Sequence, residues 1–262
     1  GRSRLDLVET LGQLERVRHL LVSRDGVYQF NQSKVREVLV SDTPWELRRE
    51  YHRVAAAALR QQRQAGLPVG DIELGQHLYA GEEWEDATDL LLPAADEALN
   101  LFAWHEAAEL YDQVVEACQH TDGPEETCLR ALRGAGRAYA QLTANDSARD
   151  RFHEMRGRAQ GAGLLVHEGD AWQQLGWLNR RAGQLEAAAH AFDQAGVLLA
   201  DCSDNEAILI RARSLADWGS VDFERGEYDR ADARWRRALD TLPQDSAEAA
   251  DVLNNLAVLA TV

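Results

Sequence analysis

Three arginines, at positions 130, 133 and 137, have a spacing that suggests ligand binding. Steps of three and four residues place Arg130, Arg133 and Arg137 on one face of a helix. A guanidinium group holds a carboxylate or a phosphate through two parallel hydrogen bonds. The stripe could therefore bind an anionic group of a peptide or of a small metabolite. The alternative is that these arginines pair with neighbouring acids on ordinary solvated helix faces.

Motifs for catalysis are absent from the sequence. It contains no P-loop glycine pattern, no His-Glu-x-x-His, no Cys-x-x-Cys and no Gly-x-Ser-x-Gly. The histidines are well separated, and the three cysteines are too few for a disulfide framework or a zinc site. Cys118 and Cys128 flank a short turn across which their side chains could meet. We therefore expect no enzymatic activity, no cofactor and no metal site.

The elements that must position the arginines follow from a motif that recurs about every forty residues. Its clearest copies comprise Trp172, Leu175, Gly176, Gly183, Ala188, Phe192 and Ala195, and then Leu215, Trp218, Gly219, Gly226, Tyr228, Ala231, Trp235, Ala238 and Pro243. Small residues would lie where two helices cross, large residues would fill the space beside them, and a glycine suits the turn between them. The motif resembles the tetratricopeptide repeat (TPR). This resemblance implies an all-α solenoid of antiparallel helical hairpins, wound as a right-handed superhelix, that serves binding or assembly.

Weaker copies extend this pattern over residues 44–262. The repeats are expected near 68–128, 129–168, 169–211 and 212–249, with a truncated repeat from 250. In the copy at 129–168, Asn145 or Asp146 would take the place of the turn glycine. In the copy at 68–128, Gly81 would be the turn glycine. The truncated repeat predicts a fragment of a longer protein that self-associates, or frays, at the end where Leu253 and Leu256 would be exposed.

A concave groove is lined, in TPR-like repeats, by set positions of each first helix. Those positions predict a groove composed of Arg130, Arg133, Arg137, Gln173, Trp177, Arg180, Arg213, Phe223 and Asn254. Trp177 and Phe223 would be its apolar anchors. Asn254, with the adjacent Asn255, resembles the asparagines that hydrogen-bond a ligand backbone in peptide-binding TPRs. The arginines would make this groove locally basic within an acidic protein.

Residues 1–43 break the helical rhythm. A helix around residues 5–16, an Asp25-Gly26 turn between apolar runs and a helix from about residue 31 to about residue 40 predict a small winged-helix-like segment with one β-hairpin. Thr43 is expected to be the N-cap of the following helix, with Pro44 at its first position.

The region from about residue 15 to about residue 115 resembles bacterial signal-transduction ATPases with numerous domains. The matching residues are Tyr28, Phe30, Arg36, Glu37, Leu39, Arg48 and His52. Gln32 stands where that family usually has histidine. The resemblance implies a P-loop ATPase upstream of this segment, followed by a winged-helix unit and TPR-like repeats.

Composition limits the classes of function. The 262 residues include 28 basic and 44 acidic side chains, for a net charge of −16, which argues against nonspecific nucleic-acid binding. We find no membrane-spanning apolar run and no signal peptide in the sequence, and therefore expect a cytoplasmic location. We predict a non-enzymatic interaction and regulatory module that binds a protein, a peptide or a second copy. The alternative is a small-molecule sensor for an anionic ligand.

Overall fold

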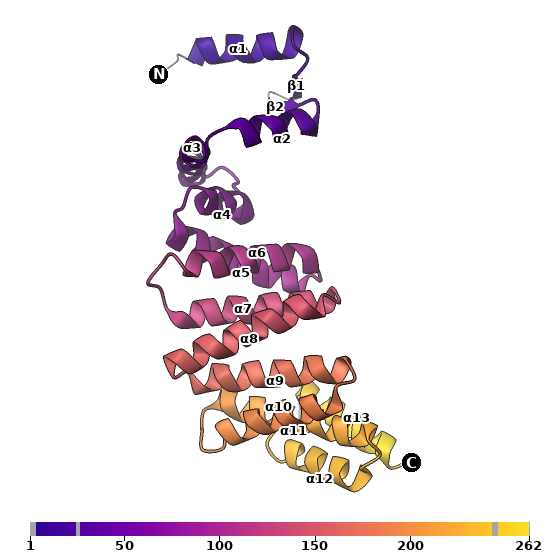
Figure 1. Cartoon of the computed structure of the whole chain (residues 1–262). Helices are drawn as coiled ribbons and strands as arrows, with labels where there is room; N and C mark the ends of the chain where they lie inside the picture. Colours follow the sequence, from indigo (N-terminus) through magenta and orange to yellow (C-terminus); the bar gives the residue numbers. More distant parts are fainter. Residues whose placement is uncertain (1–3, 25–26, 243–245, 262) are drawn as a thin grey trace. The chain divides into compact units, whose positions relative to one another are not determined.

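The computed structural model describes residues 4–24, 27–242 and 246–261. They form thirteen helices and one two-stranded sheet, so the expected all-α fold with a single β-hairpin is confirmed (Figure 1). The chain divides into two compact units, one comprising residues up to 69 with 80–83, the other residues 70–79 and those from 84 onward. The predicted domain boundary between residues 43 and 44 stays a prediction. Asp25-Gly26 and Pro243 lie outside the described residues.

The first unit contains a helix, a hairpin and two further helices. Its elements are α1 (Arg4–Arg16), β1 (Leu21–Arg24), β2 (Val27–Phe30), α2 (Ser33–Asp42) and α3 (Trp45–Gln64). The strands are antiparallel, with Leu21 opposite Phe30. Among the described residues of this unit, Leu21 and Ala56 are the buried apolar side chains. The described part of this unit therefore has little core of its own.

The start of α3 differs from the prediction. Pro44 is the N-cap of α3, and Thr43 is the C-cap of α2. The Thr43 hydroxyl donates a hydrogen bond to the carbonyl of Leu39 at 2.7 Å. The last carbonyls of a helix lack intrahelical partners, so this hydroxyl satisfies the end of α2 instead of the beginning of α3.

The second unit is a stack of helices in chain order. Its elements are α4 (Asp71–Ala80), α5 (Trp84–Asn100), α6 (Trp104–Cys118), α7 (Glu125–Gln141), α8 (Asn145–Ala162), α9 (Leu165–Arg181), α10 (Leu185–Leu198), α11 (Asn205–Glu224), α12 (Tyr228–Leu239) and α13 (Ala247–Leu259). From α5 onward each helix packs against the next. The odd-numbered helices also contact one another in succession, α5 with α7, α7 with α9, α9 with α11 and α11 with α13. No helix among the described residues is long and apolar enough to cross a membrane.

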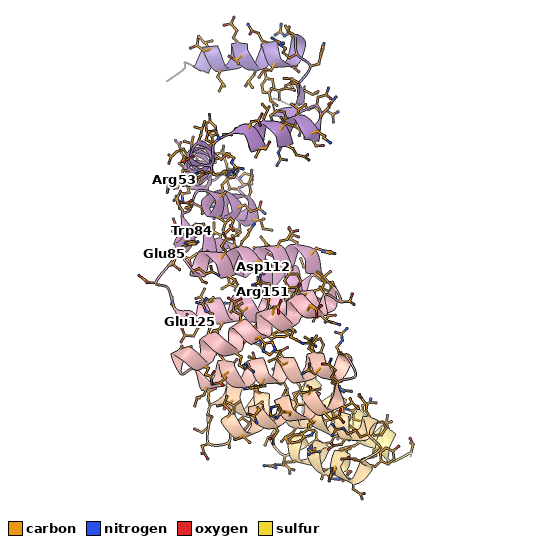
Figure 2. The ribbon with its side chains drawn as sticks, viewed as in Figure 1. Arg53, Trp84, Glu85, Asp112, Glu125 and Arg151 are labelled. Carbon is orange, nitrogen blue, oxygen red and sulfur yellow. The ribbon has the colours of Figure 1, made fainter. Side chains whose placement is uncertain are left out.

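Polar contacts also join successive helices of the stack. Asp112 of α6 accepts a hydrogen bond from the Tyr139 hydroxyl of α7 at 2.6 Å. The same carboxylate lies 3.0 Å from a guanidinium nitrogen of Arg151 on α8, and both residues are labelled in Figure 2. One aspartate thus links three consecutive helices.

The small positions of the repeat motif are close helix crossings. A Cβ atom added to Gly176 would lie 2.5 Å from the ring of Phe192, which is buried in the same hairpin. The same pairing recurs at Gly136 with Phe152 and at Gly219 with Trp235. A spacing of sixteen residues therefore couples a glycine on the first helix to an aromatic ring on the second.

The turns between paired helices require one residue in the left-handed region. Gly183 has φ of 71° and Gly226 has φ of 78°, as the sequence predicts. The next amide in each turn, that of Gln184 or Glu227, donates a hydrogen bond to the carbonyl five residues earlier. This geometry satisfies a carbonyl at the end of each first helix.

Two other turns place a different residue in this conformation than the sequence suggests. Thr143 has φ of 59°, whereas Asn145 and Asp146 begin α8. Glu82, with φ of 59°, takes the place expected for Gly81. In every one of these turns the left-handed residue comes two positions before the second helix. The position required for closing the hairpin therefore outweighs the intrinsic preference of the residue.

A candidate binding groove on the first helices

A cavity of about 410 Å³ lies between α9, α11 and α13, the first helices of three successive repeats. It brings together five of the predicted groove residues, namely Gln173, Trp177, Arg180, Arg213 and Asn254. The volume is within the range typical of small-molecule and peptide-side-chain pockets. Its walls combine an indole, three amides and two guanidinium groups with the carboxylates of Asp217, Glu248 and Asp251.

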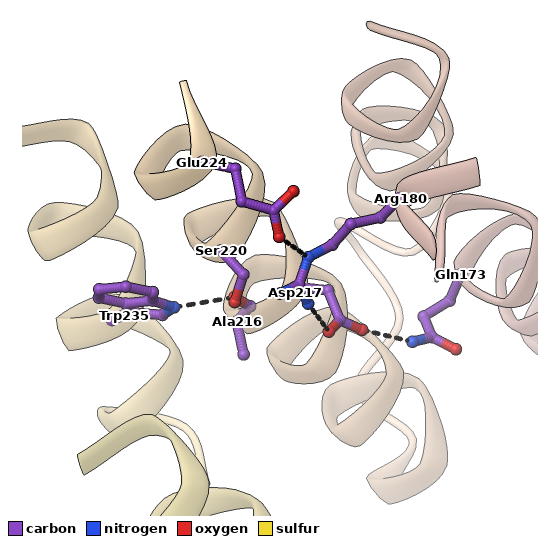
Figure 3. A network of polar contacts seen from close by, with 7 residues as sticks. All are labelled: Gln173, Arg180, Ala216, Asp217, Ser220, Glu224 and Trp235. Carbon is purple, nitrogen blue, oxygen red and sulfur yellow. Dashed lines mark hydrogen bonds and ion pairs between the residues drawn. The ribbon is translucent and has the colours of Figure 1, made fainter. Parts of the chain in front are cut away.

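Asp217 is the centre of the polar network in this cavity (Figure 3). Its carboxylate accepts a hydrogen bond from the Gln173 amide at 2.9 Å and lies 3.6 Å from a guanidinium nitrogen of Arg180. Arg180 also donates to Glu224 at 2.8 Å. Burial raises the pKa of Asp217 to about 6, although Arg180 and Gln173 act in the opposite direction. The charge of the cavity therefore changes just below neutral pH.

The wall formed by α11 is tied to the hydrophobic core. The Trp235 indole nitrogen donates to the Ala216 carbonyl at 2.9 Å, and the Ser220 hydroxyl donates to the same oxygen at 3.2 Å (Figure 3). Trp235 is also the ring that packs against Gly219. The cavity is thus built on a helix whose position is determined by core packing.

Most of the predicted arginines form ion pairs between alternate helices of the stack. These pairs are Arg130 with Asp96, Arg133 with Asp170 (2.8 Å), Arg180 with Glu224 (2.8 Å) and Arg213 with Glu248 (2.6 Å). Each pair joins consecutive members of the series α5, α7, α9, α11 and α13. Neighbouring acids therefore compensate most of the positive charge expected for the groove. This pairing is the alternative that the sequence left open for these arginines.

Arg137 differs from the other four arginines. Within the part of the chain that the structure describes, no carboxylate lies within ion-pair distance of its guanidinium group. The residue is solvent-exposed, but the surrounding helices partly desolvate its guanidinium group. This desolvation lowers the pKa of Arg137, and the charge of Arg133 lowers it further. Asp170 and Tyr111 raise the pKa of Arg137, and Arg213 lowers it further. Arg137 therefore carries a positive charge that a ligand could compensate.

Phe223 does not line this cavity. Its ring packs against Tyr228 and Trp235, with centroid distances of 5.4 and 5.8 Å. Phe223 lies in the last turn of α11, next to the hairpin turn, so its ring covers the core of its own hairpin. The indole of Trp177 does line the cavity, and the guanidinium of Arg181 lies 4.7 Å from its ring centroid.

Two acids of the cavity, Asp217 and Glu248, are residues that the sequence did not point to, whereas Asp251 occupies a groove position of its repeat. Asp217, Glu248 and Asp251 all line the cavity. Asp217 follows Arg213 by four positions and therefore shares its helical face, which is a signal that could have found it. The described residues contain no group of three or more His, Cys, Asp or Glu side chains that could hold a metal ion.

Comparisons with known proteins identify the fold. No protein-family model and no curated protein matches the chain. It is similar to BtubC (BKLC) from P. vanneervenii, with a TM-score of 0.54, 15% identity and 84% of each chain covered. It is also similar to a putative kinesin light chain of Podosopora anserina with TPR-like repeats (TM-score 0.53, 17% identity, 65% of this chain and 84% of that chain). A Rap protein complexed with Competence and Sporulation Factor is similar as well (TM-score 0.53, 12% identity, 97% and 68%). At such identities the shared property is the fold, which is that of a TPR-like helical solenoid.

Proposed function

We propose that this chain is a non-enzymatic interaction module that binds an extended segment of a partner protein along α7, α9, α11 and α13. The observation that carries this proposal is the cavity of about 410 Å³ in which Gln173, Trp177 and Asn254 converge. An apolar ring beside the exposed amide of Asn254 suits a peptide, because the ring can anchor a side chain while the amide pairs with backbone groups.

The distribution of charge favours a particular kind of segment. Arg137 has no acidic partner among the described residues, so an acidic side chain or a terminal carboxylate would complement it. At the other end of the groove, Asp217, Glu248 and Asp251 outnumber Arg180 and Arg213. The best complement is therefore a segment with an acidic group near α7 and an apolar or basic portion near α13.

The fold and the resemblance in the first part of the chain support this role. One solved structure of similar fold is complexed with Competence and Sporulation Factor. The residues that resemble signal-transduction ATPases favour a regulatory module in a larger cytoplasmic signalling or transcription-regulating ATPase of a bacterium. Self-association through α13 is part of the same proposal, since Leu253 is 54% exposed there, whereas Leu256 packs against the neighbouring core.

A peptide selection would test the groove. Random twelve-residue peptides displayed on phage would be selected on the immobilised chain, and the best binders would be measured by fluorescence polarisation. We expect Trp177→Ala or Arg137→Ala to weaken binding by about 30-fold, the effect of losing an interface residue that contributes about 2 kcal/mol. Trp45→Ala and Arg237→Ala are matched controls, because both side chains are exposed and lie outside the groove. Equal losses in the controls, or none in the groove variants, would argue against this site.

An anionic small molecule is the second candidate ligand, favoured by the uncompensated guanidinium of Arg137 near Arg133 and Arg213. Nucleotides and dicarboxylates would be screened by thermal shift at low and physiological salt. A sensor predicts stabilisation by one of these compounds that disappears in Arg137→Ala, with no peptide binder from the selection. An interaction module predicts the reverse.

A further inference from the structure

Two cysteines meet at one end of α6 and α7, away from the groove. Cys118 is the last residue of α6, and Cys128 lies in the first turn of α7, so the short connection between these helices brings the two thiols together. Both thiols are free, and both line a second cavity, of about 320 Å³. Its walls also include Glu85, Thr88, Thr121, Glu125 and Arg158. Glu85 and Glu125, labelled in Figure 2, mark this end of the stack.

The two thiols have different environments. Cys118 is partly exposed, whereas Cys128 is fully buried. A hydrogen bond from Cys128 and the charge of Arg158 lower the pKa of Cys118, whereas the pKa of Cys128 is raised by its contact with Cys118 and by burial. Arg158 is held in place by two hydrogen bonds to the Glu125 carboxylate, at 2.6 and 3.0 Å. The accessible sulfur is thus the better nucleophile.

We propose that Cys118 and Cys128 form an oxidisable dithiol that a hydroperoxide converts into an intramolecular disulfide. The Cys118 thiolate attacks the terminal peroxide oxygen, the O–O bond breaks, and the other oxygen leaves as an alcohol or water after taking up a proton. Cys118 is then a sulfenic acid. The sulfur of Cys128 attacks the sulfur of Cys118, the S–O bond breaks, and the hydroxyl leaves as water with the proton of Cys128.

The bond would join neighbouring helices at the point where the chain passes from one hairpin to the next. α6 packs along both α5 and α7, so a covalent link at its end would fix its crossing with α7. Cys202, the remaining cysteine, lies in the connection between α10 and α11 and packs beside a different cluster. It provides an internal reference for the reactivity of an isolated thiol.

Intact mass spectrometry tests the proposal in a Cys202→Ser chain, which keeps only the two thiols of interest. The chain would be treated with hydrogen peroxide, denatured and alkylated with N-ethylmaleimide. We expect loss of two hydrogen atoms, no alkylation and a monomer on a non-reducing gel, with both thiols restored by dithiothreitol. Two alkylated thiols after peroxide, or a disulfide between two chains, would overturn the proposal.

A second measurement tests the assigned roles. In a Cys128→Ser/Cys202→Ser chain, Cys118 should form a sulfenic acid, trapped by dimedone, about tenfold faster than Cys202 does in a Cys118→Ser/Cys128→Ser chain. Arg158→Gln should reduce this advantage, since it removes the nearby positive charge. Equal rates for Cys118 and Cys202 would contradict the role of Cys118 as the attacking thiol, whether or not a disulfide forms.

Discussion

The close crossing at Gly176 yields a quantitative prediction for Gly176→Ala. The added methyl group would lie 2.5, 2.7 and 2.9 Å from three carbons of the Phe192 ring. Carbon atoms in favourable contact are about 3.5–4.0 Å apart, so the ring would have to move by about 1 Å. Phe192 is 1% exposed and packs with Ala188 and Val221, so moving its ring disturbs these contacts.

Two opposing effects determine the magnitude for Gly176→Ala. Overpacking of a filled core costs about 1–3 kcal/mol, whereas replacing glycine by alanine within a helix gains about 0.5–1 kcal/mol. We therefore expect a net loss of about 1–2 kcal/mol. Gly157, inside α8, is the matched control, because a methyl group there would contact nothing within 4 Å. Gly157→Ala should gain about 0.5–1 kcal/mol.

Urea unfolding followed by far-ultraviolet circular dichroism measures both variants. With an unfolding slope of up to about 3 kcal/mol per molar urea, the Gly176→Ala midpoint should fall by about 0.5 M and the Gly157→Ala midpoint should rise. A Gly176→Ala/Phe192→Leu chain should show a favourable coupling of at least about 0.5 kcal/mol, because the clashing ring is gone. A Gly176→Ala midpoint equal to that of Gly157→Ala would refute the packing argument.

Three further predictions concern a turn, an ion pair and pH. Thr143→Gly should stabilise the chain by about 0.5–1 kcal/mol, because it removes a threonine from the left-handed region. Gly183→Ala should cost about 1 kcal/mol, because it places a Cβ atom in that region. A urea midpoint that falls in Thr143→Gly or rises in Gly183→Ala would contradict this. Arg133→Ala should cost about 1–3 kcal/mol in urea unfolding, because it leaves the Asp170 carboxylate, which is 6% exposed, without its partner; a change below about 0.5 kcal/mol would count against it. The folded pKa of Asp217 is raised to about 6, so the stability that its protonated form contributes is present below about pH 4 and is lost as pH rises through 6. The free energy of unfolding of Asp217→Asn should therefore rise by about 1–3 kcal/mol relative to that of the wild type between about pH 4 and about pH 7. Urea midpoints of the wild type and of Asp217→Asn that change in parallel with pH would disprove the raised pKa.

Local sequence spacing was sufficient for the elements and for their pairing. Helix periodicity is set by the backbone, so a glycine and a ring sixteen residues apart, as in Gly176 with Phe192, predict the crossing of two helices from spacing alone. The same holds for the turn at Gly183, whose φ of 71° favours the only residue type without a Cβ.

Side-chain partners over a longer range were not predictable from spacing. Arg180 is paired with Glu224 of the next repeat, and Arg213 is paired with Glu248, because the rotation between hairpins brings those helix faces together. The repeat position of Phe223 predicted that it lines the groove. In the structure Phe223 lies in the last turn of α11, and its ring packs against Trp235 in the core.

The sequence by itself therefore determined the kind of solenoid, since its hairpins depend on contacts between residues close in the chain. Only the tertiary structure decided which arginines keep an uncompensated charge. Arg133 and Arg137 share one helical face in the sequence, but the stacking of α9 on α7 brings Asp170 to within 2.8 Å of Arg133, whereas Arg137 has no such partner among the described residues. Charge compensation in a solenoid depends on how neighbouring repeats are rotated, and this rotation results from packing along the whole stack.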